Sequence, residues 1–336
     1  MNYRVLGSVM AAAAIAFAQP VVYVAQEINK AADIIATARK AIGGGRLDAL
    51  KTFSVDASVE RNLSNMRMAS DVEIVLDLPD KFLRQDTPSG GGGGMMIIAG
   101  GGVSGFNGDR PLQRIQGGTG GGPGGAVIRM TGPVSTTTGE KPTPEQLEQL
   151  SKAAVRTART EASRLMLGWF ANAHPAADAQ YSYLGEAESV EGKAYVIEVK
   201  NADNFNARLF IDQQSNLPLM VTYQGPQPRV MTMGNPSSTA MSGGGGHVVT
   251  QMNPSMTDEQ RKKAQADAEK QIQEMQRTPQ PMVDYVVYFE EWKTVDGIKF
   301  PFKMRRAMAG TTTEEWTVNK VKVNPKVDSK RFAGES

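Results

Sequence analysis

The sequence predicts a mainly β protein with some helices (α+β), built on one curved antiparallel sheet. Apolar and polar residues alternate over 53–60 and 71–78, which is the pattern of strands with one buried and one solvent-facing side. Short turn sequences join most consecutive strands of 181–223, and such links favour an antiparallel meander over β-α-β crossovers. Long alternating segments over 283–323 complete a count of about eleven strands in one large domain.

The first eighteen residues have the features of a secretory signal peptide. Arg4 gives a short basic region, and residues 5–18 are an apolar stretch too short to span a bilayer. The tripeptide Ala-Phe-Ala that ends at Ala18 is typical of a cleavage site. We therefore expect removal of residues 1–18 and a periplasmic protein. An uncleaved N-terminal anchor is the alternative, because residues 21–24 prolong the apolar character.

Three segments predict helices. Isoleucine and alanine recur every three or four residues over 26–42 and indicate an amphipathic helix. Thr143 and Gln146 have the spacing of a capping box, followed by an apolar stripe that ends near residue 170. A second capping box precedes a poorly apolar helix over 257–277, which we interpret as solvent-facing, partner-binding or a lid.

Glycine-rich tracts interrupt the predicted domain. We expect a single domain over 26–333 with a glycine-rich insertion at 88–142 and a second insertion, rich in glycine and methionine, at 226–280. Residues 103–106 predict one strand inside the first insertion, and the Asn-Gly pair that follows is a hairpin signal. Long insertions cost a sheet little stability, because loop-closure entropy grows slowly with length.

Composition and charge exclude several classes of protein. The chain has 37 Lys and Arg against 35 Asp and Glu, so it lacks the excess of positive charge that is typical of nucleic-acid-binding proteins. We interpret pairs such as Arg305-Arg306 as solvated strand faces. The absence of cysteine excludes disulfides, zinc–thiolate sites, thiol catalysis and a lipid-modified N-terminal cysteine.

The sequence indicates no catalytic centre. His174 and His247 are its two histidines, and we interpret both as loop histidines. Two matches to the dinucleotide glycine pattern, at 100–105 and 120–125, lie in glycine tracts without a following helix. Neighbouring carboxylates such as Glu314-Glu315 face opposite sides of a strand, although a carboxylate pair from different strands stays open. We expect a protein that is not an enzyme and that needs no metal or cofactor.

Long apolar and aromatic residues share strand faces in the second half of the chain. One long sheet and two helices can bury so many apolar side chains only if the sheet rolls up. Two interpretations stay open, a plain hydrophobic core and a concave face with a cavity for an apolar ligand. For the second, the candidate lining residues are Tyr195, Ile197, Tyr285, Val287, Phe300 and Phe302.

Short motifs along residues 26–86 and 181–333 carry a family resemblance. They are Leu78-Pro79-Asp80-Lys81-Phe82, the run Asn206 to Asp212, Asn216-Leu217-Pro218-Leu219-Met220, Phe289-Glu290-Glu291-Trp292, the run Val295 to Pro301, the run Val323 to Asp328, and Arg331-Phe332. In these segments the chain resembles the bacterial outer-membrane lipoprotein carrier superfamily (LolA/LolB-like), as a divergent member with glycine-rich insertions.

The resemblance implies a fold and a function. The family fold is an unclosed β-barrel of about eleven antiparallel strands with helices that plug its mouth, and it binds acyl chains in a concave apolar interior. It implies a lipid or lipoprotein carrier whose partner is an acyl lipid or lipoprotein, with peripheral membrane contact and no nucleic acid. The alternative hypothesis is a non-catalytic envelope interaction or sensor protein that uses the same fold to bind a protein partner.

Overall fold

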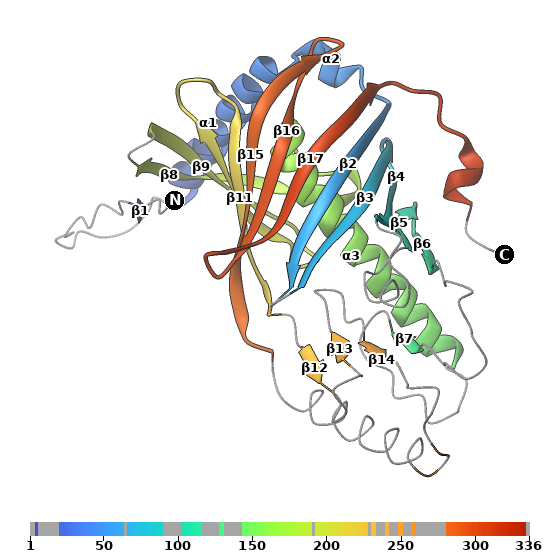
Figure 1. Cartoon of the computed structure of the whole chain (residues 1–336). Coiled ribbons are helices and arrows are strands. Elements are labelled where there is room, and N and C mark those ends of the chain that lie inside the picture. The colour runs from blue at the N-terminus through green and yellow to red at the C-terminus, as the bar shows by residue number, and fades with distance from the viewer. Residues whose placement is uncertain are drawn as a thin grey trace.

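The structure is a computed structural model in which one antiparallel sheet of 13 strands curves around a long helix (Figure 1). Its two edge strands do not pair with each other, so the barrel is not closed and the predicted fold class is confirmed. The described residues are 4–5, 20–63, 66–89, 102–115, 128–130, 143–189, 192–227, 230–232, 239–241, 248–250, 257, 259 and 280–333.

Neighbouring strands of the main sheet are antiparallel, and most of them are consecutive in the chain. In sheet order they are β1 (Arg4–Val5), β8 (Gln180–Ser189), β9 (Gly192–Lys200), β10 (Asn206–Asp212), β11 (Pro218–Pro226), β15 (Met282–Val295), β16 (Ile298–Met308), β17 (Thr311–Val323), β2 (Thr52–Leu63), β3 (Met66–Asp77), β4 (Lys81–Pro88), β5 (Gly102–Asn107) and β6 (Arg110–Ile115). The pairing of β17 with β2 joins the C-terminal strands to the N-terminal ones.

The remaining described elements are three α-helices, two short 3-10 helices and two small sheets. They are α1 (Pro20–Ile42), α2 (Gly45–Asp48), α3 (Pro144–Phe170), the 3-10 helices η1 (Pro175–Ala177) and η2 (Ser329–Phe332), and the pairs β12 (Val230–Thr232) with β13 (Thr239–Met241) and β14 (Val248–Thr250) with β7 (Ile128–Met130).

Helix α3 lies inside the curve of the sheet (Figure 1). The predicted capping box is confirmed, since the Thr143 hydroxyl accepts a hydrogen bond from the Gln146 N–H and the Gln146 side chain accepts one from the Thr143 N–H. Its apolar stripe is buried in the main core from Ala158 to Trp169, whereas Leu147 at the start of the stripe is 53% exposed. Ala171, in the left-handed conformation, ends the helix.

The first predicted insertion contributes more to the sheet than the single strand expected there. Residues 102–115 form a hairpin in which Gly108 and Asp109 make the turn between β5 and β6, at the predicted Asn-Gly signal, and β5 pairs with β4. Phe106 is completely buried and packs on Phe82, with ring centroids 6.1 Å apart. Burial of this ring gives the glycine-rich segment enough apolar contact to join the sheet.

Two other predictions fall largely outside the described residues. The helix expected over 257–277 is one of them, and residues 6–19 of the expected signal peptide are another. Arg4 and Val5, within that peptide, pair with Glu188 and Ala187 of β8. Helix α1 begins at Pro20, before the predicted start.

Gly168 of α3 packs directly against the ring of Phe289 on β15. A β-carbon at this position would lie 1.8 Å from Cζ of Phe289. We expect Gly168→Ala to lower the free energy of unfolding by about 1–3 kcal/mol through overpacking, although alanine is the better helix former by about 1 kcal/mol. Urea denaturation measures the change.

The matched control places the same substitution in a Phe289→Ala background. There the ring is absent, so Gly168→Ala should be neutral or stabilising. An equal loss of stability in both backgrounds would show that contact with Phe289 is not the cause.

Candidate functional site

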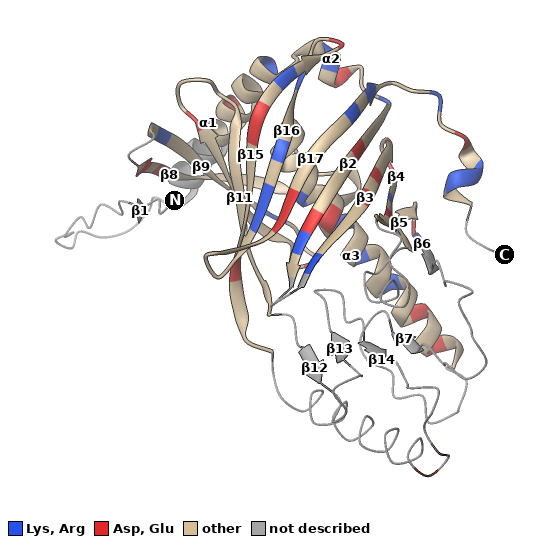
Figure 2. Cartoon of the chain, viewed as in Figure 1, with Lys and Arg blue, Asp and Glu red and all other residues tan. Residues whose placement is uncertain are grey.

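The inward-facing side chains change from apolar to charged along the strands. On three neighbouring strands the inward row runs from Phe53 to Arg61 on β2, from Val318 to Glu314 on β17, and from Phe300 to Arg306 on β16. The strand register pairs Arg61 with Glu314 and Glu314 with Arg306, so the charged ends meet. We call this charged end of the half-barrel the mouth. In Figure 2 basic and acidic bands lie side by side there on β16, β17 and β2.

The opposite, apolar end is filled by side chains of α3. Phe53 meets Phe170 edge-on with ring centroids 5.0 Å apart, and Trp169 lies 5.1 Å from Phe300. The Trp169 Nε1–H donates to the sulfur of Met304 at 3.2 Å. Phe53, Trp169, Phe170 and Phe300 are each at most 2% exposed. This end is therefore a packed core, which α1 and α2 cover (Figure 1).

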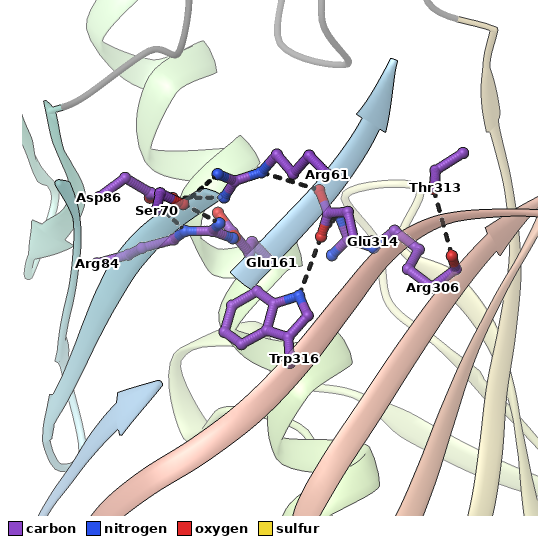
Figure 3. A network of polar contacts seen from close by, with 9 residues as sticks. All are labelled: Arg61, Ser70, Arg84, Asp86, Glu161, Arg306, Thr313, Glu314 and Trp316. Atoms are coloured by element: carbon purple, nitrogen blue, oxygen red, sulfur yellow. Dashed lines mark hydrogen bonds and ion pairs between the residues drawn. The ribbon is translucent and has the colours of Figure 1, made fainter. Parts of the chain in front are cut away.

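Arg84 is the centre of a polar network at the mouth (Figure 3). Its side chain is only 9% exposed, and its Nε donates to Oδ2 of Asp86 at 2.7 Å while Nη1 pairs with Glu161 of α3. Arg61 reaches the other oxygen of Asp86 at 2.5 Å and the Ser70 hydroxyl at 2.5 Å. The network thus ties β2, β3 and β4 to the helix.

Glu314 extends the network toward β16 (Figure 3). Its carboxylate lies 3.3 Å from Nη1 of Arg306 and 3.5 Å from Nε of Arg61, and it accepts a hydrogen bond from Trp316 Nε1–H at 3.1 Å. Burial alone would raise the pKa of Glu314, but Arg306, Arg61 and Arg84 lower it to about 2. Its contribution to stability is therefore present above the ordinary value of 4.5 and is lost as the pH falls toward 2.

Two arginines of the network, Arg84 and Arg306, stay charged for the same reason. Burial disfavours the guanidinium of Arg84, yet Asp86 and Glu161 raise its pKa well above the ordinary value. Burial likewise opposes the charge of Arg306, and Glu314 raises its pKa. Buried charges of this kind persist only with partners in place, so the network is a fixed polar lining.

A pair of stacked tyrosines lies beside the network. The rings of Tyr223 on β11 and Tyr285 on β15 are parallel within 5° with centroids 5.1 Å apart, and Cζ of Arg164 lies 3.6 Å from the Tyr223 centroid. Pro226 and Met282, at the two ends of the second predicted insertion, are paired three residues further along these strands. Both ends of that insertion therefore lie at the mouth.

The structure distributes the six predicted lining residues over both ends of the interior. Ile197 and Phe300 are fully buried in the core, and Val287 is 7% exposed. Tyr195 and Phe302 pack partly buried against the same core, while Tyr285 stacks at the mouth. That these residues line a ligand cavity stays a prediction.

The arginines of the network were not predicted, and the interpretation of Arg305-Arg306 as a solvated face is half wrong. Arg305 faces outward, 4.3 Å from the Tyr288 ring, whereas Arg306 faces inward to Glu314. Alternation gives the signal, since Arg306 continues the inward row of Phe300 and Met304. The opposite orientation expected for Glu314 and Glu315 is confirmed, because only Glu315 is exposed.

His174 is on the predicted connection after α3, but it is buried. It is 1% exposed, its Nδ1 accepts a hydrogen bond from the Ala176 N–H at 3.2 Å, and its ring meets Phe106 edge-on at 5.1 Å. Burial lowers its pKa to about 4, so the imidazole is neutral near pH 7. His247 lies outside the described residues.

The outer face of the sheet has a shallow polar pocket of about 290 Å³ near Asp56, Asp71 and Glu73. Two of these carboxylates are already engaged, since Asp71 accepts hydrogen bonds from Ser58 and Ser89 and Glu73 pairs with Arg331. Among the residues that the structure describes, no group of three or more potential metal-ligating side chains occurs. Within the same residues, no helix has the length and apolar character needed to cross a membrane.

Comparison with known sequences gives no match, either to a protein-family profile or to a curated protein. Comparison with solved structures finds similar folds at low identity. A LolA superfamily protein from Nitrosomonas europaea is 8% identical with a TM-score of 0.45, covering 90% of this chain and 97% of that one.

Two further structures are similar over most of their length. A DUF1329 family protein from Desulfovibrio piger has 8% identity and a TM-score of 0.42 over 91% of this chain and 97% of that one. A domain described as outer-membrane lipoprotein-sorting, from Vibrio parahaemolyticus, has 8% identity and a TM-score of 0.40 at the same coverage.

Proposed function

We propose that this chain is a non-catalytic periplasmic binding protein that holds the acyl chain of a lipid or lipoprotein against its concave face. The observation that carries the proposal is the sorting of the inward rows, apolar at one end and charged at the mouth. Ligand sites for apolar molecules combine an apolar lining with a few placed polar groups. An amphiphile matches this order because its chain and its head need opposite surroundings.

The ligand enters at the mouth, because α3 fills the other end. Tyr223 and Tyr285, both partly buried, provide apolar surface next to the charged network, and Val287 and Trp316 belong to the buried core beside them. Two of them, Tyr285 and Val287, belong to the predicted lining. Each methylene removed from water contributes about 0.8 kcal/mol, so a short length of chain against this surface gives measurable affinity.

Replacement of Tyr285 by alanine tests the site. We expect Tyr285→Ala to weaken binding of dodecanol, a probe without charge, by about tenfold, since it removes roughly the contact area of an aromatic side chain. Tyr288→Ala is the matched control, because Tyr288 lies on the same strand but faces outward beside Arg305. Isothermal titration calorimetry measures both. Equal affinities for the two variants would contradict a site at the mouth.

Native mass spectrometry of the protein, purified gently from its own source, tests the ligand class. A co-purifying acylated species that lipid extraction recovers supports the proposal. A protein that carries no lipid, and that binds no acyl probe when incubated with one, contradicts it and favours a protein partner.

A further inference from the structure

Arg164 occupies a distinct position at the mouth. It lies half-buried on α3, and Cζ is 3.6 Å from the centroid of the Tyr223 ring. Tyr223 is supported in turn by the parallel ring of Tyr285, whose hydroxyl donates to the carbonyl oxygen of Pro226 at 3.0 Å. The guanidinium is therefore held in place by ring contacts, which do not use its N–H donors.

The charges at the mouth do not balance. Arg61 pairs with Asp86 and Glu314, Arg84 with Asp86 and Glu161, and Arg306 with Glu314. With Arg164 included, four arginines face three carboxylates. In the part of the chain that the structure describes, Arg164 has no ion pair or hydrogen bond, and its Nε is buried without an acceptor.

The surroundings of Arg164 leave its charge under-compensated. Burial is the largest cause that lowers its pKa, and the positive charge of Arg306 lowers it too. Together they outweigh Tyr223, Glu161 and Tyr285, which raise it, whereas the carboxylates around Arg84 and Arg306 raise the pKa values of those two arginines above the ordinary value. A partly desolvated guanidinium is stabilised by an anion that accepts its N–H donors. Carboxylate and phosphate groups match the planar fork and form two parallel hydrogen bonds with it.

We propose that Arg164 binds an anionic group, carboxylate or phosphate, carried by the acyl ligand at the mouth of the half-barrel. This inference rests on the proposed function and adds the class of head group to it. The carboxylates of the network neutralise the other three arginines, so one negative charge on the ligand completes the balance. Tyr223 and Tyr285 screen the new ion pair from water on one side.

The test compares dodecyl phosphate with dodecanol, which share a chain and differ in charge. We expect the wild-type protein to bind dodecyl phosphate about tenfold to a hundredfold more tightly, as a charge-assisted hydrogen bond contributes. Arg164→Met should abolish this preference and leave dodecanol binding within about twofold. Arg164→Lys keeps the charge without the fork and should retain part of the preference. Arg156→Met, at an exposed position of the same helix, is the control and should behave as wild type.

The outcomes separate the inference from the proposed function. Equal affinity of the wild-type protein for both probes, or an unchanged preference in Arg164→Met, overturns the head-group site while acyl binding stands. Competition with inorganic phosphate identifies the source of the anion. If inorganic phosphate displaces neither alkyl probe, the anion that Arg164 binds belongs to the head group of the ligand. If neither alkyl probe binds, acyl binding is wrong. Arg164-dependent binding of inorganic phosphate would then still support the anion site, and its absence would overturn that as well.

Discussion

Replacement of Arg84 by methionine is expected to lower the free energy of unfolding by about 3–5 kcal/mol, which is the usual cost of removing one partner from a buried ion pair. Arg84 donates to Asp86 and pairs with Glu161, and its own side chain is only 9% exposed. Without it, Glu161 has no remaining ion pair among the described residues, and Asp86 keeps only Arg61. The loss therefore comes from carboxylates left without a counter-charge. Urea denaturation monitored by far-UV circular dichroism measures it.

Two further variants make the result specific. Arg67→Met removes an arginine that also pairs with a carboxylate but is 69% exposed, and it should change stability by less than about 1 kcal/mol. The double variant Arg84→Met/Glu161→Gln should be more stable than Arg84→Met, because one uncompensated charge is gone. A loss below about 1 kcal/mol for Arg84→Met would mean that the network adds nothing to the fold.

Acidification from pH 7 to pH 4 is expected to remove about 3 kcal/mol of stability through His174 alone. The value follows from the fall of its pKa from 6.5 to about 4, at 1.36 kcal/mol per unit. A lowered histidine pKa means that the unfolded state takes up the proton first, so stability decreases as the pH falls through this interval. The buried imidazole beside Phe106 must be charged inside the core or exposed.

The variant His174→Asn isolates this effect. Asparagine keeps an acceptor for the Ala176 N–H but does not titrate, so the variant should lose less stability than wild type between pH 7 and pH 4. Its stability at pH 7 can be lower, because the smaller side chain leaves a cavity against Phe106. Nuclear magnetic resonance of the imidazole gives the pKa directly. If wild type and His174→Asn lost equal stability between pH 7 and pH 4, or if the imidazole had a pKa near 6.5, the buried, neutral state of His174 would be contradicted.

Local pattern was sufficient to predict the long strands and helix α3. Alternation with a period of two predicted the long strands, because inward and outward side chains meet different surroundings whatever the partner strand is. The capping box at Thr143 predicted the start of α3, since both of its hydrogen bonds are made within four residues. The Asn-Gly pair indicated the hairpin after Phe106, in which Asn107 ends β5 and Gly108 adopts the positive φ that the turn requires.

The sequence alone determined the strands, the capped helix, the exclusion of thiol and disulfide chemistry, and the curved antiparallel class. Only the tertiary structure decided which end of the concave face is filled and which is charged. Arg306 comes from a strand far along the chain from those of Arg61 and Arg84, and the register across β17 brings Arg61 and Arg306 together on Glu314. A charged residue in an alternating strand has the same local pattern whether it meets water or a buried carboxylate, so its partner depends on long-range pairing.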